Sequence, residues 1–153
     1  MIKSSRHSKI TGDFGEALVL YWLSRHGYEC ARVDHTGIDL IARDRNSTEV
    51  LGISVKCRSR ATGTEGTHVN LYKSDFEKVR QACDAFHCTP YLAIVVDESD
   101  HIRTLLLPLS HVLTLCPGGE KVSAWQMSES RLAKYRVDPQ IRSFEFQLCG
   151  GKW

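Results

Sequence analysis

The sequence predicts an α/β domain built on a mixed β-sheet, and three features of its segments lead to this prediction. A helix-like segment precedes three strand-like segments between residues 28 and 58. A second helix-like segment, 74–86, is followed by the continuously apolar run 91–96. Such a run is typical of a strand buried on both faces of a sheet. We therefore expect the first three strands to form a meander, and the 91–96 strand to return through a helical crossover.

The first helix is expected to begin at Thr11, after a mobile basic arm of residues 1–9. Glu16 lies in its first turns, where the helix dipole favours acids, and Gly27 suits its end. Glu16 is then either an ordinary solvated acid or a carboxylate that the helix directs at a site. The apolar residues at helical spacing, which we expect to face the core, are Phe14, Ala17, Leu18, Tyr21 and Trp22.

Three strands are expected to follow, at residues 28–33, 38–42 and 50–58, with turn residues 46–48 between the second and the third. The segment 60–68 is rich in Gly and Thr and is therefore expected to be a loop.

The second helix is expected to begin at Ser74, with Glu77 completing a capping box. After the 91–96 strand, we expect another strand at 101–109 and a short helical turn at 110–115.

The 153 residues suit a single domain, with its core at about residues 10–115 and a C-terminal extension at 117–153. The extension shows weaker signals, for a short strand, a helix and a half-buried strand, at residues 124–127, 130–135 and 141–148.

Composition excludes several classes of protein. With 42% apolar and 25% charged residues, the chain is expected to fold rather than to be disordered. Its apolar runs are far shorter than the roughly 18 residues of a membrane span. None of its six cysteines forms a CxxC pair, so we expect reduced thiols and no zinc. We expect a cytoplasmic protein that has no contact with a membrane.

Two charged residues, Asp39 and Lys56, lie in otherwise apolar strand segments. Burying either charge is costly unless it is paired or bound to a metal. Residues i and i+2 of a strand share a face. Ser54 and Lys56 should therefore point one way, while Leu51, Ile53 and Val55 point the other way into the core. Pairing of the two strands would bring Asp39 and Lys56 within reach of each other.

This arrangement resembles the PD-(D/E)XK nuclease superfamily. Glu16 on the opening helix is followed by Asp39 within residues 37–39 (GID) and by Lys56 within residues 53–56 (ISVK). The layout is most similar to Holliday-junction resolvases and Mrr-type restriction endonucleases, and the resemblance covers about residues 9–110. It implies a restriction-endonuclease-like core, αβββαβ, with a mixed central sheet flanked by helices.

The resemblance also implies an activity and roles for the site residues. The protein would be a metal-dependent DNA endonuclease that hydrolyses phosphodiester bonds with one or two Mg²⁺ or Mn²⁺ ions. Asp39 would be the principal metal ligand, the backbone carbonyl of Val55 a second ligand, and Glu16 would complete the site. Lys56 would position or activate the water and stabilise charge on the phosphate.

Ser54 departs from the family pattern, which has Asp or Glu two residues before the lysine. Serine is at best a weak, neutral ligand. Three interpretations remain open. Glu16, or Asp34 in the preceding loop, supplies the second acid; the metal binds weakly and is completed by DNA phosphate; or catalysis is lost and the fold binds DNA or a protein partner. A further alternative is a structural domain in which Asp39 and Lys56 form an ordinary ion pair.

The expected partner is duplex or branched DNA. Arg58, Arg60 and Lys9 form a basic group beside the expected site, suited to phosphate contacts that position DNA without reading its sequence. Because cutting two strands requires two sites, we expect a homodimer.

Overall fold

The structure is a computed structural model that describes residues 3–61, 63–64, 66–98 and 100–148. In chain order, its elements are α1 (His7–Arg25), β1 (Tyr28–His35), β2 (Ile38–Asp44), β3 (Val50–Ser59), β4 (Val69–Tyr72), α2 (Lys73–Phe86), β5 (Thr89–Asp97), β6 (His101–Pro108), α3 (Leu109–Leu115), β7 (Val122–Trp125), α4 (Glu129–Val137) and β8 (Arg142–Gln147).

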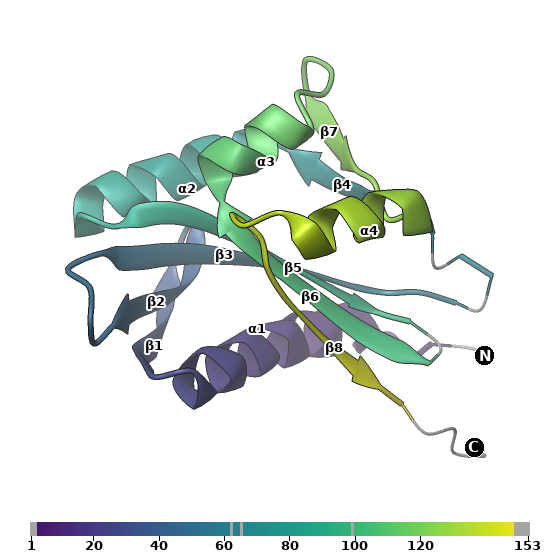
Figure 1. The fold of residues 1–153 in the computed structure, drawn as a ribbon, viewed down its shortest axis with the longest axis horizontal. Helices are drawn as coiled ribbons and strands as arrows, with labels where there is room; N and C mark the ends of the chain where they lie inside the picture. Colours follow the sequence, from purple (N-terminus) through teal and green to yellow (C-terminus); the bar gives the residue numbers. More distant parts are fainter. Residues whose placement is uncertain (1–2, 62, 65, 99, 149–153) are drawn as a thin grey trace.

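A six-stranded mixed sheet forms the centre of the molecule, in the order β1-β2-β3-β5-β6-β8 (Figure 1). The first three strands pair antiparallel, and β5 returns parallel to β3 after the α2 crossover. β4 and β7 form a separate two-stranded antiparallel sheet. The predicted fold class, with its order αβββαβ, is confirmed, and β4 is a short addition between β3 and α2.

Helices cover both faces of the central sheet: α1 lies on one side, and α2 and α3 lie on the other (Figure 1). The core under α1 includes Val19 and Leu23 from the helix and Leu51 and Ile53 from β3. The opposite core joins α2, α3 and α4 to the other side of the sheet. The strand alternation predicted for β3 is therefore confirmed, because Leu51 and Ile53 face α1.

Two glycines allow the helices to approach β3 closely. A Cβ atom added at Gly15 of α1 would lie 2.6 Å from Cβ of Cys57, and one added at Gly52 of β3 would lie 2.5 Å from Sγ of Cys83 in α2. Such separations are too short for packed atoms, so a larger side chain would force each helix away from the sheet. Close packing therefore fixes both helices over β3, the strand that carries Ser54 and Lys56.

Several predicted boundaries are wrong. Helix α1 begins at His7, so residues 7–9 of the predicted arm are helical. Thr11 does not cap the helix, because its hydroxyl donates to the carbonyl of His7 at 2.8 Å, one turn earlier. Helix α2 begins at Lys73, and no side-chain hydrogen bond caps it, so the predicted capping box of Ser74 does not form.

The C-terminal extension shares the cores formed by the rest of the chain. β8 adds to the central sheet beside β6, and β7 pairs with β4. Trp125 is fully buried and stacks on Tyr135 of α4, with 4.5 Å between ring centroids. The hydrophobic core therefore continues well beyond the predicted limit at residue 115.

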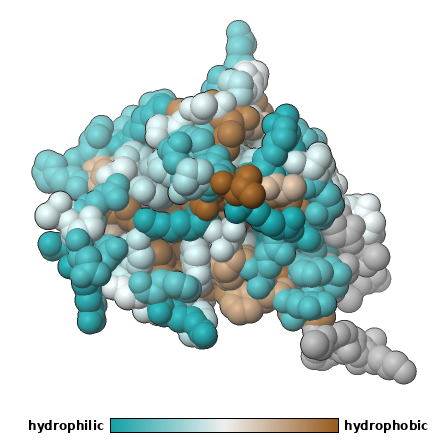
Figure 2. Space-filling model, in the orientation of Figure 1, coloured by the Kyte–Doolittle hydropathy of each residue, from teal (hydrophilic) through white to brown (hydrophobic). Residues whose placement is uncertain are grey.

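The face of the molecule drawn in Figure 2 is mainly hydrophilic, with small hydrophobic patches between polar side chains. Within the described part of the chain, no helix is both long enough and apolar enough to cross a membrane.

Candidate functional site

Asp39 lies where β2 and β3 separate. The last pair of their ladder joins Leu40 to Ile53. Beyond this pair, Oδ2 of Asp39 accepts a hydrogen bond from the backbone N–H of Val55 at 2.6 Å and one from the Ser54 hydroxyl at 3.4 Å. The carboxylate thus replaces a missing strand partner, which explains how an acid is accommodated within an apolar strand.

The backbone of Val55 faces the same side as Asp39. In a strand, the N–H and C=O of one residue point to the same neighbouring strand. Since the Val55 N–H is directed at Asp39, its carbonyl oxygen is also directed to this side of β3. Among the described residues, no hydrogen bond to Oδ1 of Asp39 is found, so this oxygen is available to a ligand.

Two cavities meet at Asp39. The first, which we call the acidic cavity, has a volume of about 400 Å³ and is lined by Asp13, Glu16, Arg32, Val33, Asp34, His35 and Asp39. The second, which we call the lysine cavity, has a volume of about 180 Å³ and is lined by Thr36, Gly37, Asp39, Ser54, Lys56, Asp75 and Lys78. The two cavities therefore share Asp39 as a lining residue.

In the lysine cavity, the strand alternation places Ser54 and Lys56 side by side on the face of β3 that α2 covers. Ser54 is only 3% exposed. Nζ of Lys56 lies 3.1 Å from Oδ2 of Asp75, in the first turn of α2, and Nζ of Lys78 lies 3.6 Å from Oδ1 of the same residue. The predicted alternative in which Lys56 pairs with Asp39 is therefore wrong, because Asp75 is its ion-pair partner.

Gly37 holds the turn between β1 and β2 against α2. Its φ angle is +108°, which residues with a side chain rarely adopt, and an added Cβ would lie 2.3 Å from the carbonyl oxygen of Lys78. The turn therefore lies directly on the backbone of α2. This contact places Asp39, two residues later, in the same cavity as Asp75.

In the acidic cavity, α1 contributes Glu16. Its carboxylate lies 3.5 Å from the guanidinium of Arg32, on β1. Burial raises the pKa of Glu16 above its ordinary value, and the nearby charge of Asp39 raises this pKa further, whereas Arg32 opposes the shift. Glu16 is therefore close enough to Asp39 for the two carboxylates to repel each other, as expected for two acids that share a site.

The donor set fits a hard divalent cation of modest affinity. Mg²⁺ is commonly held by one or two carboxylates and keeps waters or substrate phosphate as its other ligands. Asp39, Glu16 and the Val55 carbonyl supply donors of this type, and the repulsion that raises the pKa of Glu16 is the kind that a cation relieves. Among the described residues, no three His, Cys, Asp or Glu side chains are grouped closely enough to hold a metal by themselves.

The three predicted DNA-contacting residues lie in different settings. Arg58 is exposed on β3, two residues beyond Lys56. Lys9 is exposed and pairs with Asp13, a residue of the acidic cavity, at 3.2 Å. Arg60 is partly buried and donates to the carbonyls of Thr67 and His68, which fixes the following loop. Arg60 therefore has a structural use that the sequence pattern did not indicate.

Asp75 was not predicted from the sequence. An acid in the first turn of a helix has an ordinary explanation in the helix dipole, so nothing local marks it as unusual. The predicted helical crossover could have indicated it. In this fold the helix that follows the lysine strand packs back over that strand, so its first turn lies near Lys56.

Comparisons with known proteins bear on the fold. No protein-family model and no curated protein matches the sequence. Among solved structures, the chain is similar to Hjc of Archaeoglobus fulgidus, a Holliday junction resolvase from an archaeal hyperthermophile. The TM-score is 0.52 at 20% sequence identity, covering 74% of this chain and 88% of the resolvase. This likeness supports the restriction-endonuclease-like fold expected from the sequence.

Proposed function

We propose that the protein is a metal-dependent DNA endonuclease that hydrolyses phosphodiester bonds in duplex or branched DNA. The observation that carries this proposal is the position of Asp39 between the acidic cavity of Glu16 and the lysine cavity of Lys56. The likeness to a Holliday junction resolvase supports it at the level of the fold.

Asp39, Glu16 and the Val55 carbonyl would hold Mg²⁺ or Mn²⁺, with phosphate and water completing the ligand set. The cation, when bound, would polarise the phosphate and acidify an attacking water. Asp39 stays fixed because Val55 and Ser54 donate hydrogen bonds to one of its oxygens.

Lys56 would stabilise charge on the phosphate and orient the water. Its ammonium group is held at the cavity by Asp75 at 3.1 Å, so it is positioned before the substrate arrives. Arg58 and Lys9, both exposed, would contact phosphates of the flanking DNA. Two copies of the chain would act together, since cutting both strands requires two sites.

Cleavage of linear, supercoiled and four-way-junction DNA with Mg²⁺ or Mn²⁺ tests the proposal directly. We expect the wild type to cut, and Lys56→Ala and Asp39→Ala each to lose activity by about a hundredfold or more. Lys134→Ala, at an exposed lysine of α4, is the matched control and should cut normally. Equal cutting by the wild type and both site variants would refute the proposal.

A specific observation favours a second candidate, a nuclease fold that binds DNA or a protein partner without cutting. Ser54 occupies the position where an acid is expected, it is buried, and its hydroxyl donates to Asp39. A site with one fewer negative charge has lower affinity for a cation. Binding of four-way-junction DNA without cleavage under any metal condition would favour this candidate.

A further inference from the structure

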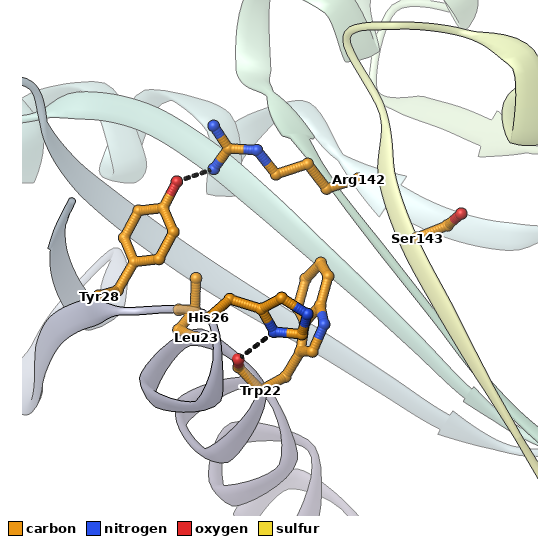
Figure 3. A pocket seen from close by; sticks show the side chains of 6 residues that line it. All are labelled: Trp22, Leu23, His26, Tyr28, Arg142 and Ser143. Carbon is orange, nitrogen blue, oxygen red and sulfur yellow. Dashed lines mark hydrogen bonds between the residues drawn. The ribbon is translucent and has the colours of Figure 1, made fainter. Parts of the chain in front are cut away.

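A hollow separate from both cavities lies between the end of α1, the start of β1 and the start of β8 (Figure 3). Its volume is about 310 Å³, at the small end of the roughly 300–1,000 Å³ typical of ligand pockets. It is lined by Trp22, Leu23, His26, Tyr28, Arg142 and Ser143. It shares no lining residue with the acidic cavity or the lysine cavity.

Aromatic rings form much of its surface. Trp22 is partly buried, and its ring lies 4.4 Å from the ring of Phe144 and 5.5 Å from the ring of His26, measured between centroids. Nδ1 of His26 is hydrogen-bonded to the carbonyl of Trp22 at 2.8 Å, which leaves Nε2 to a ligand. Leu23, only 2% exposed, adds an apolar contact. A flat apolar group would therefore meet rings that are already held in place.

Arg142 supplies a positive charge at the same hollow. Its guanidinium reaches across from β8 and donates to the hydroxyl of Tyr28, and it lies 5.4 Å from the centre of the Tyr28 ring (Figure 3). No carboxylate lines the hollow. Among the described residues, Arg142 forms no ion pair within 4.0 Å. The charge is therefore available to an anion.

We propose that this hollow binds a nucleotide, with the base against the aromatic rings and the phosphate on Arg142. Any base can stack on an aromatic ring, because every base has a flat π-face. A guanidinium group matches the geometry and the charge of a phosphate. The Nε2 of His26 provides a polar group for the edge of the base.

The nucleotide has two sources that share this chemistry: a free mononucleotide, or an unpaired nucleotide in a DNA strand. The strand source rests on the proposed function. Trp22 lies six residues beyond Glu16 on α1, about 9 Å along the helix, and Tyr28 lies four residues before Arg32 on β1, about 13 Å along the strand. A strand leaving the acidic cavity would reach the hollow within a few nucleotides.

Tryptophan fluorescence in EDTA tests the proposal without cleavage. The probes are deoxyadenosine monophosphate, deoxyadenosine, inorganic phosphate and a short single-stranded oligo(dA). We expect saturable quenching by the monophosphate, and Trp22→Phe should remove this signal. Arg142→Gln should weaken binding of the monophosphate by about tenfold while leaving deoxyadenosine nearly unchanged, and Tyr28→Leu should weaken both by about tenfold. Arg25→Gln, at an exposed arginine outside the hollow, is the matched control.

These measurements distinguish a free nucleotide from a nucleotide in a DNA strand, and either of these from a hollow that binds no nucleotide. Much tighter binding of oligo(dA) supports the strand source, and equal binding supports the free nucleotide. Absence of saturable quenching, or equal binding by Arg142→Gln, Tyr28→Leu and the wild type, would overturn the proposal. An emission change that follows protein concentration would also overturn it, because the hollow would then be covered by a second copy. Asp39→Asn should bind nucleotide normally, because Asp39 does not line the hollow. A wild-type protein that shows saturable quenching but does not cleave DNA counts only against the proposed function.

Discussion

The acidic cavity and the lysine cavity share Asp39 but differ in their other charged groups. In the acidic cavity, Glu16 adds a second carboxylate whose pKa is raised by burial and by Asp39. In the lysine cavity, Lys56 and Lys78 both approach Asp75. This difference indicates that the acidic cavity suits a cation, whereas the lysine cavity suits the negative charge of a phosphate. The following predictions alter first the shared residue and then one cavity at a time.

The largest effect is expected for Asp39→Asn, because this residue belongs to both cavities. Asparagine keeps an oxygen that can accept from the Val55 N–H, so the fold should be retained while the charge is lost. We expect cleavage of junction DNA to fall by roughly a hundredfold to a thousandfold. Asp44→Asn, the same change at the other end of β2, serves as the control and should cut like the wild type.

Asp75→Asn should separate turnover from DNA binding. Removing this acid frees Lys56 from its partner, which should lower kcat by about tenfold, and leaves the lysine cavity more positive, which should lower KM for DNA. Steady-state cleavage kinetics measure both constants. Asp84→Asn, exposed near the end of the same helix, is the control. A rise in KM with unchanged kcat would contradict the positioning role of Asp75.

Ser54→Glu should introduce an acid beside Asp39, two residues before Lys56. Because the site is buried and adjoins Asp39, the added charge should destabilise the metal-free protein by about 1–3 kcal/mol, and Mg²⁺ should recover most of this loss. Thermal unfolding with and without Mg²⁺ measures the effect. We also expect tighter metal binding and faster cleavage; no change in either would mean that Ser54 does not adjoin the metal.

The smallest effect is expected for Glu16→Gln in the absence of metal. A raised pKa means that the folded protein binds this proton more tightly than the unfolded chain, so ionisation of Glu16 costs stability as pH rises through the raised pKa. At pH 7 the variant should melt about 1–2 °C above the wild type. Below about pH 4, where the carboxyl is protonated in both states, the difference should vanish. A variant less stable than the wild type at pH 7 would contradict the repulsion from Asp39.

The sheet could be predicted from the sequence because its signals are local. Alternation in β3 identified the face that carries Ser54 and Lys56, and the apolar run of β5 marked a strand buried on both faces. β4 was missed because it has four residues and is stabilised by pairing with β7, about fifty residues later.

The helices were predicted less accurately, for physical reasons. Apolar residues of α1 occur on several sides of the helix. Their spacing therefore does not identify which side is buried. Phe14 and Tyr21 of the expected stripe are 39% and 52% exposed, and the helix instead buries Gly15, Val19 and Leu23. The approach of Gly15 to Cys57 decides which side faces the sheet, and no local pattern reports such a contact.

Contacts between distant segments also limited what could be predicted of the candidate site. Asp39 and Lys56 were noticed because charges are unusual in apolar strands. The partnership of Lys56 with Asp75 depends on how the crossover packs α2 over β3, which only the folded chain reveals.

Asp39 is proposed to be the cation-binding member of a site whose other side is Lys56. Mn²⁺ binding in the absence of DNA, followed by electron paramagnetic resonance, tests this role. We expect Asp39→Asn to weaken Mn²⁺ affinity by about tenfold to a hundredfold, roughly the loss typical of substitutions around a metal site. Lys56→Ala should bind Mn²⁺ at least as tightly as the wild type. Equal Mn²⁺ affinity in the wild type and Asp39→Asn would show that Asp39 does not bind the cation.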